Sequence, residues 1–474
     1  MLFNSFQYIL LFLPVVVITL IAVRRLAGAR AAQLFVLLVS VVFYGWFRSS
    51  FLWYLGGSIV ANWFLARRIA SAEGPSRKRW LQLGLVANVG FLSTFKYINF
   101  LARTLPFAHG REHLIPDLES PLGLSFFTLT QVMYLVDCYE SVLPASTLFD
   151  HATFVSFFPY VISGPLARAK RMIHQFGNFG GTDGRPTESV SRGLFLFSMG
   201  LFKKAVFAQT FSQIADFGFN SVQHRSALEA AVFSGAYMFQ IYFDFSGYSD
   251  MAIGTAEMLG ITIPPNFDAP LRSVSLIEFW QRWHISLSGF ITTYLYTPML
   301  RGLGRVSLAK SMLATLLAMA IAGLWHGPSW TFVVFGLLHG AGLALNSLWR
   351  RKSGVRLPRA LSWLLTILYV DVAFVFFRSA TLWDALRLLC DLVSWHHPLG
   401  AANLVQMRAN FSWPIFGPPL LFGLLAAFIG KSSEARAREF RPHWKTALLC
   451  GLGFAISALF LNSEITASFI YFKF

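Results

Sequence analysis

Apolar segments with few or no charges recur along the whole chain and constrain its fold more than any other feature. They cover residues 7–23, 31–48, 51–66, 81–95, 193–211, 228–243, 311–325, 329–347, 361–377, 415–429 and 446–461. Inside a bilayer the backbone finds no water to bond, so only helices and closed barrels cross it. A helix needs about 17–25 apolar residues to do so, and several of these segments are shorter, so we expect some helices to be tilted, paired or broken. The sequence predicts an all-α integral membrane protein with about 11 transmembrane helices plus re-entrant or interfacial helices, as one polytopic domain over residues 1–474.

Positive charge is placed as in a membrane protein rather than as in a nucleic-acid-binding protein. The formal net charge of +17 would suggest a nucleic-acid partner for a soluble chain. Here Arg24, Arg25 and Arg30 follow the first apolar segment, and basic residues at 67, 68 and 77–79 follow the third. Loops rich in Lys and Arg face the cytoplasm, which predicts an extracytoplasmic N-terminus, membrane lipids as partners and no nucleic acid. Because the charges follow the first segment instead of preceding it, we expect residues 1–23 to be retained as a helix.

The stretch Gly323-Leu324-Trp325-His326-Gly327-Pro328 places an imidazole where an apolar helix breaks. Proline has no N–H and its predecessor disfavours the α region, so the helix over residues 311–325 is expected to end here. That helix is about 22 Å long, short of a hydrocarbon core of about 30 Å, so His326 is predicted to lie within the membrane. A polar side chain there is a functional hypothesis, and burial favours the neutral imidazole that a general base requires. The alternative is an interior histidine that only bonds a neighbouring helix.

A second imidazole, His284, lies in residues 275–296, which are amphipathic rather than apolar. Ser275 and Glu278 form a capping box, which is a helix-start signal. Glu278 precedes Arg282 by four residues, the favourable orientation for a helical ion pair. These signals predict one helix in an interfacial or re-entrant position. Its shared face would carry Trp280, His284, Leu287 and Ser288.

Packing alone is the alternative role for His284. His339 follows His326 by thirteen residues in an apolar segment, and we predict that it is structural.

Polar residues also interrupt the apolar segment that precedes residue 250. Asp244 lies among aromatic residues, where a carboxylate is costly unless it is paired or hydrated. The alternative to a direct chemical role is a structural hydrogen-bond hub. The residues predicted to support the two histidines or to line a passage beside them are Gln240, Tyr242, Asp244, Ser246, Arg282 and Trp325.

Several familiar kinds of site have no signature in this sequence. Cys138, Cys390 and Cys450 lack the spacing of a disulfide framework or a zinc site, so we expect no metal. No nucleophile elbow, P-loop or dinucleotide fingerprint accompanies the histidines. A general-base histidine without a protein nucleophile implies direct attack by an acceptor hydroxyl on an activated carbonyl. The residues alone leave two classes open, an intramembrane transferase and a proton-coupled transporter.

These motifs resemble the membrane-bound O-acyltransferase (MBOAT) family, specifically its bacterial alginate O-acetyltransferase branch. The resembling segments are residues 1–5, 95–97, 121–128, 158–159, 163–165, 202–204, 242–250, 266–267, 279–287, 323–327, 376–378 and 469–474. Their order and number make the resemblance specific. One stretch departs from the pattern: Thr292-Thr293 replace the usual Arg-Asp, Leu300-Arg301 replace a double glycine, and Gln281 replaces a common Arg.

The resemblance implies a helical fold around a tunnel that crosses the membrane. It implies that His326 is catalytic and that His284 is a second essential residue. It also implies a cytosolic acyl thioester donor (usually acetyl-coenzyme A, otherwise an acyl-carrier protein) and an extracytoplasmic partner protein that takes part in acetylation. We therefore expect a bacterial inner-membrane O-acyltransferase that moves an acyl group, foremost acetyl, to hydroxyls of an exported or cell-surface polysaccharide.

Three alternatives remain open from the sequence. The cargo could be D-alanine or another acyl group for a cell-envelope polymer. A proton-coupled transporter or flippase would move a substrate without cleaving a thioester. A scaffold would only recruit an acetylating partner.

Overall fold

The computed structural model describes residues 1–104, 118–180, 186–221, 225–394, 402–410, 412–462 and 470, and this part of the chain is helical without a β-strand. The predicted all-α membrane fold is confirmed. Among the described residues, six helices are long and apolar enough to cross a membrane: Gln7–Gly45, Thr187–Asn220, Leu308–His326, Trp330–Lys352, Arg359–Arg378 and Trp444–Leu461. Of the last resembling segment, residues 469–474, all but Ile470 lie outside the described residues.

The chain divides into two compact units. Unit 1 comprises Met1–Ser198, Ser249–Pro265 and Phe440–Cys450, and unit 2 comprises Met199–Tyr248, Asn266–Glu439 and Gly451–Phe474. Three helices contribute residues to both units: α8 (Pro186–Phe202), α10 (Ala227–Met258) and α21 (Trp444–Leu461). The single domain over residues 1–474 stays a prediction.

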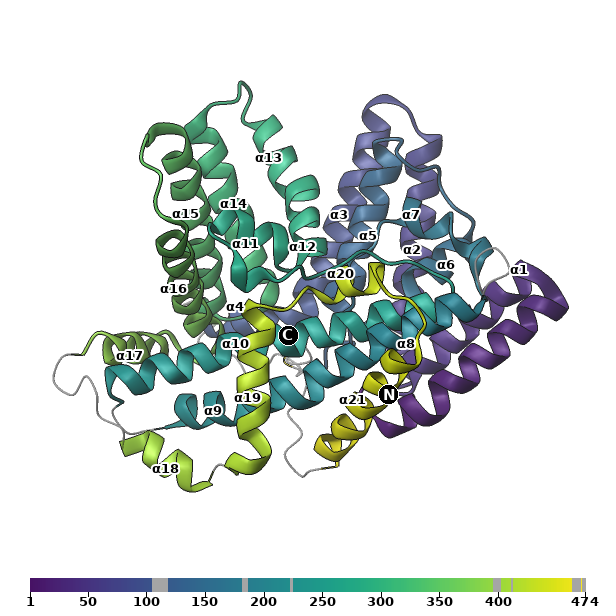
Figure 1. The fold of residues 1–474 in the computed structure, drawn as a ribbon. Helices are drawn as coiled ribbons and strands as arrows, with labels where there is room; N and C mark the ends of the chain where they lie inside the picture. Colours follow the sequence, from purple (N-terminus) through teal and green to yellow (C-terminus); the bar gives the residue numbers. More distant parts are fainter. Residues whose placement is uncertain are drawn as a thin grey trace. The chain divides into compact units, whose positions relative to one another are not determined.

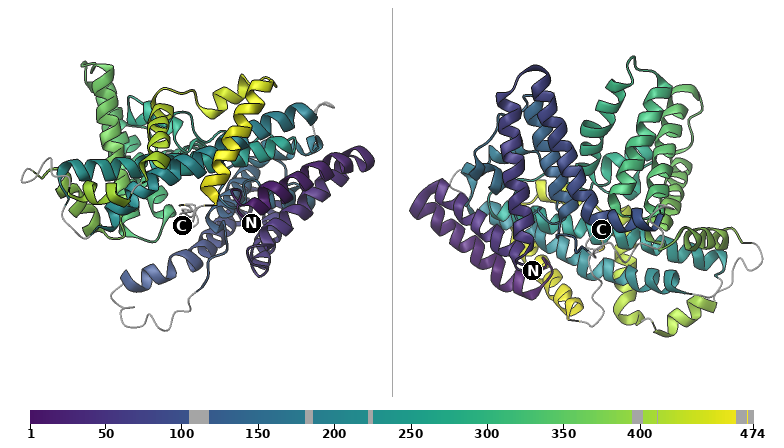
Figure 2. Two further views of the ribbon diagram at one scale, coloured as in Figure 1. Left: turned by 60° about the horizontal axis from the view of Figure 1, so that its bottom comes forward. Right: turned by 180° about the vertical axis from the view of Figure 1, so that it is seen from behind.

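Unit 1 begins with a helical hairpin. The first helices, η1 (Gln7–Phe12) and α1 (Leu13–Gly45), run on as one segment, but the backbone of Gly28 leaves the helical region with φ 82°. Figures 1 and 2 show this purple segment doubling back on itself. The ring centroids of Phe3 and Phe43 accordingly lie 5.8 Å apart. The apolar segments 7–23 and 31–48 therefore form two helices joined at a glycine that tolerates positive φ.

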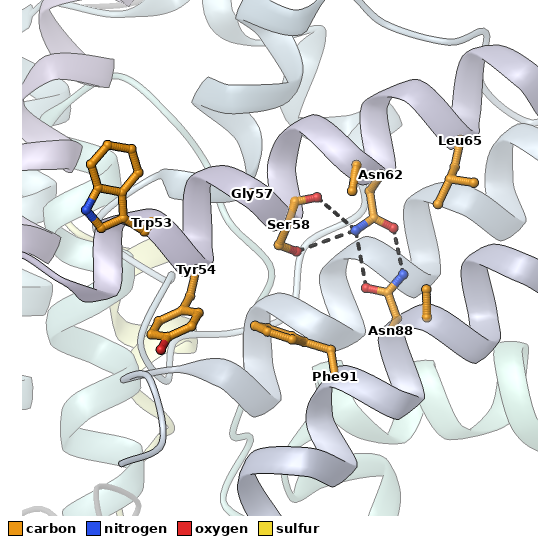
Figure 3. A pocket seen from close by; sticks show the side chains of 10 residues that line it. Trp53, Tyr54, Gly57, Ser58, Asn62, Leu65, Asn88 and Phe91 are labelled. Carbon is orange, nitrogen blue, oxygen red and sulfur yellow. Dashed lines mark hydrogen bonds between the residues drawn. The ribbon is translucent and has the colours of Figure 1, made fainter. Parts of the chain in front are cut away.

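The remaining helices of unit 1 include one pair held by buried amides. They are α2 (Phe51–Ser71), α3 (Gly74–Lys96), α4 (Ile98–Thr104), α5 (Leu124–Tyr139), α6 (Leu148–Ser156), α7 (Ala169–Ile173), η4 (Phe176–Asn178) and most of α8. Between α2 and α3, Asn62 and Asn88 donate to each other's side-chain oxygens, at 3.3 and 2.6 Å (Figure 3). Each amide also donates to a carbonyl of its own helix, Ser58 or Gly84. Both asparagines line a cavity of about 300 Å³. Their amide N–H groups are satisfied within the protein, as in amides that join membrane helices.

Unit 2 contains most of the helices that carry the predicted site. They are η5 (Lys203–Ala208), α9 (Gln209–Asn220), η6 (Pro270–Arg272), α11 (Leu276–Arg282), α12 (Ile285–Phe290), η7 (Ile291–Tyr296), α13 (Thr297–Gly302), α14 (Leu308–His326), α15 (Trp330–Lys352), α16 (Arg359–Arg378), α17 (Leu382–Leu392), α18 (Ala402–Asn410), α19 (Trp413–Phe428) and α20 (Ser433–Arg438). Helices α14, α15 and α16 lie side by side in Figures 1 and 2.

Helices α14 and α15 form a hairpin that depends on glycine. A Cβ atom on Gly323 would overlap the carbonyl oxygen of Phe332 and the backbone of Gly336. A Cβ on Gly336 would in turn overlap the carbonyl oxygen of Met319. Small residues let membrane helices approach closely and gain van der Waals contact. The close approach fixes the register of α14, and His326 at its end, against α15.

We predict that Gly323→Ala destabilises the protein, because the added methyl meets backbone atoms that cannot move aside. Overpacking of this kind costs about 1–3 kcal/mol. The apparent melting temperature of the detergent-solubilised protein should fall. The control is Gly235→Ala on α10, where an added Cβ meets no atom within 4 Å. Equal melting temperatures for the two variants would contradict this account of the hairpin.

Candidate active site

His326 is the last residue of α14, where the sequence predicts the helix break. Helix α14 ends at His326, and Gly327 adopts an extended conformation. The His326 side chain is buried among aromatic rings, with centroid distances of 5.0 Å to Trp325, 5.2 Å to Phe377 and 6.0 Å to Phe335. Trp325, a predicted supporting residue, is thus the ring closest to His326 among these three.

The prediction of one continuous helix over residues 275–296 is wrong. Its local signals are confirmed: the Ser275 hydroxyl accepts from the N–H of Glu278 at 3.1 Å, and Glu278 pairs with Arg282 at 2.9 Å. The helix nevertheless stops at Arg282, because Trp283 forms an antiparallel bridge with Phe267. Helix α12 and the π-helix η7 follow. The predicted shared face of Trp280, His284, Leu287 and Ser288 therefore does not exist.

The bridge places His284 in an unusual backbone conformation. Its φ is 43° and its ψ is 53°, in the left-handed region that non-glycine residues rarely occupy. The side chain is 1% exposed. Its Nδ1 lies 3.0 Å from Oδ1 of Asn266, and that oxygen also accepts from the Ser286 hydroxyl at 2.8 Å. A carboxamide oxygen only accepts, so Nδ1 of His284 carries the hydrogen, and in the neutral ring Nε2 is the basic nitrogen.

An unbroken series of aromatic contacts joins the surroundings of the two histidines. From His326 it passes to Phe377 at 5.2 Å, then to Phe374 at 6.3 Å and to Trp283 at 5.2 Å. Trp283 directly precedes His284. The two predicted catalytic residues therefore belong to one buried aromatic layer of unit 2. That their rings meet in a hydrated passage stays a prediction.

Four of the predicted supporting residues lie on α10 and are buried. Asp244 forms a buried ion pair with Lys204 and accepts a hydrogen bond from the N–H of Ile470 at 2.9 Å. It therefore makes the contacts of a structural hub. Tyr242 packs with ring centroids 6.1 Å from Phe267 and 6.4 Å from Trp283, beside the bridge that positions His284.

The other two supporting residues of α10 hold polar atoms that the described part of the chain does not satisfy. Oε1 of Gln240 and Oγ of Ser246 are buried there without a hydrogen-bond partner. A buried polar atom left unsatisfied costs about 1–3 kcal/mol, and such an atom in a native protein calls for an explanation, such as a catalytic role or a bound molecule. Both atoms lie on the helix that carries Phe245, whose ring meets the His284 ring at 4.7 Å. The two oxygens are therefore available to a bound molecule, and their place beside His284 stays a prediction.

Arg282 joins α11 to the segment before it, and a place beside a passage stays a prediction for this residue. Its guanidinium is partly exposed, pairs with Glu278 at 2.9 Å and donates to the carbonyl oxygen of Asp268 at 3.3 Å. The second contact ties the end of α11 to the residue that follows the Phe267 bridge.

A cavity of about 590 Å³ lies between α11, α12 and η7 on one side and α14 and α15 on the other. Its polar lining residues are Trp280, Gln281, Ser288, Thr292, Thr293, Tyr296, Thr315 and Ser347. No Lys, Arg, Asp, Glu or His is among its lining residues. Sequence reasoning missed this cavity, although Gln281, Thr292 and Thr293 are positions where the chain departs from the MBOAT pattern. The other lining residues of the cavity, among them Ile277, Ile291 and Leu343, are apolar, and a mainly apolar lining with a few hydroxyl and amide groups suits an uncharged ligand segment.

Two of the helices that line the cavity, α14 and α15, also carry residues at or next to His326. On α14, Thr315 and Met319 line the cavity, and His326 follows Met319 by seven residues, on the same face of the helix. On α15, Leu343 lines the cavity, His339 lies one turn away and Phe335 one turn further. Phe335 contacts His326. His326 therefore lies two turns of α14 beyond the lining residue Met319.

The described part of the chain holds no group of three or more His, Cys, Asp or Glu side chains placed to bind a metal ion.

The family model of the membrane-bound O-acyltransferases matches residues 74–382. The chain belongs to the MBOAT family. It is 34% identical to the peptidoglycan O-acetyltransferase of Helicobacter pylori, over 100% of this chain and 98% of that protein. It is 35% identical to a probable alginate O-acetylase of Pseudomonas aeruginosa, over 91% of this chain and 81% of that protein. This MBOAT protein is therefore a membrane O-acyltransferase.

A more distant similarity connects it to enzymes with another cargo. It is 29% identical to the teichoic acid D-alanyltransferase of Streptococcus thermophilus, over 53% of this chain and 62% of that protein.

We predict that Asp244→Asn destabilises the protein, because Lys204 loses the carboxylate that compensates its buried charge. Breaking one side of a buried ion pair costs about 3–5 kcal/mol. The double variant Asp244→Asn with Lys204→Met should recover part of the loss, since no buried charge then remains. Thermal unfolding of the solubilised variants measures the coupling. Strictly additive losses would show that the pair is not coupled.

Proposed function

We propose that this MBOAT protein transfers an acetyl group from cytosolic acetyl-coenzyme A to hydroxyls of an exported cell-envelope polysaccharide. The observation that carries the proposal is the series of buried aromatic contacts that links His326 to Trp283, next to His284, in the unit that also holds a cavity between α11, α12, η7, α14 and α15. The relatives support acetyl as the cargo, since those named as acetylating enzymes match over most of the chain and the D-alanyltransferases over about half. Their names also support a polysaccharide acceptor.

The chemistry is direct acyl transfer. His326 takes the proton from the acceptor hydroxyl as its oxygen attacks the acyl carbonyl. The carbon–sulfur bond then breaks, the thiolate leaves and recovers the proton, and an ester and a free thiol result. His284 orients the hydroxyl, because the Asn266 bond holds its ring with Nε2 as the acceptor. General-base catalysis of this kind contributes about 10²–10⁴-fold.

The donor is proposed to enter from the basic end of the α14–α15 hairpin. Arg301, Arg305 and Lys310 lie near the start of α14, and residues 350–352 end α15 with two Arg and one Lys. Loops of this charge face the cytoplasm and attract phosphate groups. The cavity lies between this end and His326, so the uncharged arm of a coenzyme A thioester could fill it while the phosphates stay at the basic rim.

The same reasoning supports the proposed location. The protein would lie in the bacterial inner membrane with its N-terminus outside, because Arg24, Arg25 and Arg30 flank the turn of the first hairpin. The acyl group would leave on the extracytoplasmic side, to a partner protein or directly to the polysaccharide.

We predict that His326→Ala remains folded and loses at least about 10²-fold in acetyl transfer, the size expected for a lost general base. The measurement is transfer of labelled acetyl and release of free thiol by the protein in liposomes. The matched control is His151→Ala, which removes a fully buried imidazole of unit 1 and should keep wild-type activity per folded molecule. A wild-type rate in His326→Ala would refute the assignment.

The same assay separates the alternatives. Thiol release from acetyl-coenzyme A excludes a transporter that only moves its substrate. Reaction with a D-alanyl carrier protein but not with acetyl-coenzyme A would replace the proposed cargo.

We predict that Ala318→Phe raises the KM for acetyl-coenzyme A about tenfold, because a phenyl ring would fill part of the cavity; tenfold corresponds to about 1.4 kcal/mol. The control is Leu317→Phe, at a neighbouring position of α14 that is 45% exposed and does not line the cavity. An unchanged KM in Ala318→Phe would show that the donor binds elsewhere.

A further inference from the structure

His339 is a third buried imidazole of unit 2, and it lies between the cavity and His326. Ser347 and Leu343 of α15 line the cavity. His339 follows on the next turn toward the start of the helix, and Phe335 on the turn after that. The ring centroid of Phe335 is 4.7 Å from His339 and 6.0 Å from His326. Along α15, His339 therefore lies between the turns that line the cavity and Phe335, the ring that contacts both His339 and His326.

One hydrogen bond determines which nitrogen of His339 carries the hydrogen. The indole nitrogen of Trp280 donates to Nδ1 of His339 at 3.2 Å. An indole N–H can only donate, so Nδ1 must be the unprotonated nitrogen, and the hydrogen of the neutral ring sits on Nε2. Trp280 also lines the cavity. The same tryptophan therefore lines the cavity and holds the His339 ring in its orientation.

The Nε2–H group has no acceptor in the described part of the chain. Nε2 of His339 is buried there without a hydrogen-bond partner. The His339 ring packs parallel to the Phe279 ring, with centroids 6.2 Å apart, and edge-on to the Phe335 ring. If His339 served packing alone, an apolar side chain would fill the site without the cost of an unsatisfied donor, about 1–3 kcal/mol. The donor is therefore explained by a ligand atom that accepts from it.

We propose that the Nε2–H of His339 donates a hydrogen bond to the carbonyl oxygen of the acyl thioester as it reaches His326. The inference rests on the proposed function, because it takes the cavity as the donor site. The carbonyl oxygen gains negative charge when the hydroxyl attacks, and a fixed donor in a water-poor site stabilises that charge. His339 is then a catalytic residue, and Trp280 is a positioning residue that holds its tautomer.

Two substitutions separate this role from packing. In His339→Asn the side-chain oxygen can take the place of Nδ1 and accept from Trp280, but the donor at Nε2 is lost. In His339→Gln the amide N–H reaches the place of Nε2. We expect kcat to fall about 10²-fold in His339→Asn, as for loss of an oxyanion donor, with KM for acetyl-coenzyme A nearly unchanged. The kcat of His339→Gln should be at least about tenfold higher than that of His339→Asn.

The matched control is His151→Asn, which alters another fully buried imidazole, in unit 1, and should leave kcat unchanged per folded molecule. A kcat near wild type in His339→Asn, with His326→Ala inactive, overturns the inference and leaves the proposed function standing. Equal kcat losses in His339→Asn and His339→Gln also overturn it, because the donor would then be irrelevant. A fully active His326→Ala instead overturns the proposed function.

An infrared measurement tests the bond itself. Acetyl-coenzyme A labelled with ¹³C at the carbonyl is bound to His326→Ala, which should not turn it over. Its carbonyl stretch should lie below the solution frequency, because a donated hydrogen bond weakens the C=O bond. In the double variant His326→Ala with His339→Asn the solution frequency should return. The same lowered frequency in both variants would show that another group binds the carbonyl.

Discussion

A polar atom buried in an apolar interior has to be bonded within the protein, and the surroundings of His284 depend on one such set of bonds, centred on Asn266. Its side-chain oxygen accepts from Nδ1 of His284 and from the hydroxyl of Ser286, and its backbone carbonyl accepts from the N–H of Ile285. The next residue, Phe267, bridges to Trp283. Asn266 therefore fixes both the tautomer and the left-handed backbone of His284. The cost of the unusual backbone is offset by bonds that no regular helix would make.

Buried amide and hydroxyl groups are satisfied to different degrees in the two units. In unit 1, Asn62 and Asn88 donate to each other and to their own helices, which leaves a stable joint between α2 and α3. In unit 2, Gln240 and Ser246 keep buried oxygen atoms that other described residues do not satisfy. Polar groups that are fully satisfied stabilise packing, whereas those held ready at a site favour a bound molecule over an empty interior.

Local patterns predicted the parts of the site that depend on neighbouring residues. The Gly327-Pro328 break places His326 at the end of α14, and the Glu278–Arg282 pair forms as its spacing indicates. The end of α11 could not be read in this way, because Trp283 is drawn out of the helix by Phe267, sixteen residues earlier. The cavity could not be predicted either, because it is formed by the packing of five helical segments, and sequence periodicity does not describe how helices pack. His339 looked structural because only the fold reveals its bond to Trp280 and its place beside the cavity.

The turn at Gly28 has a consequence for how the protein enters the membrane. The two helices that it joins can leave the ribosome in quick succession and insert as one unit, with their facing apolar sides already in contact. On the proposed orientation, the arginines beside the turn resist translocation, so they hold the tip in the cytoplasm while both ends of the hairpin face outward. The orientation of this first hairpin would then bias the topology of the later segments.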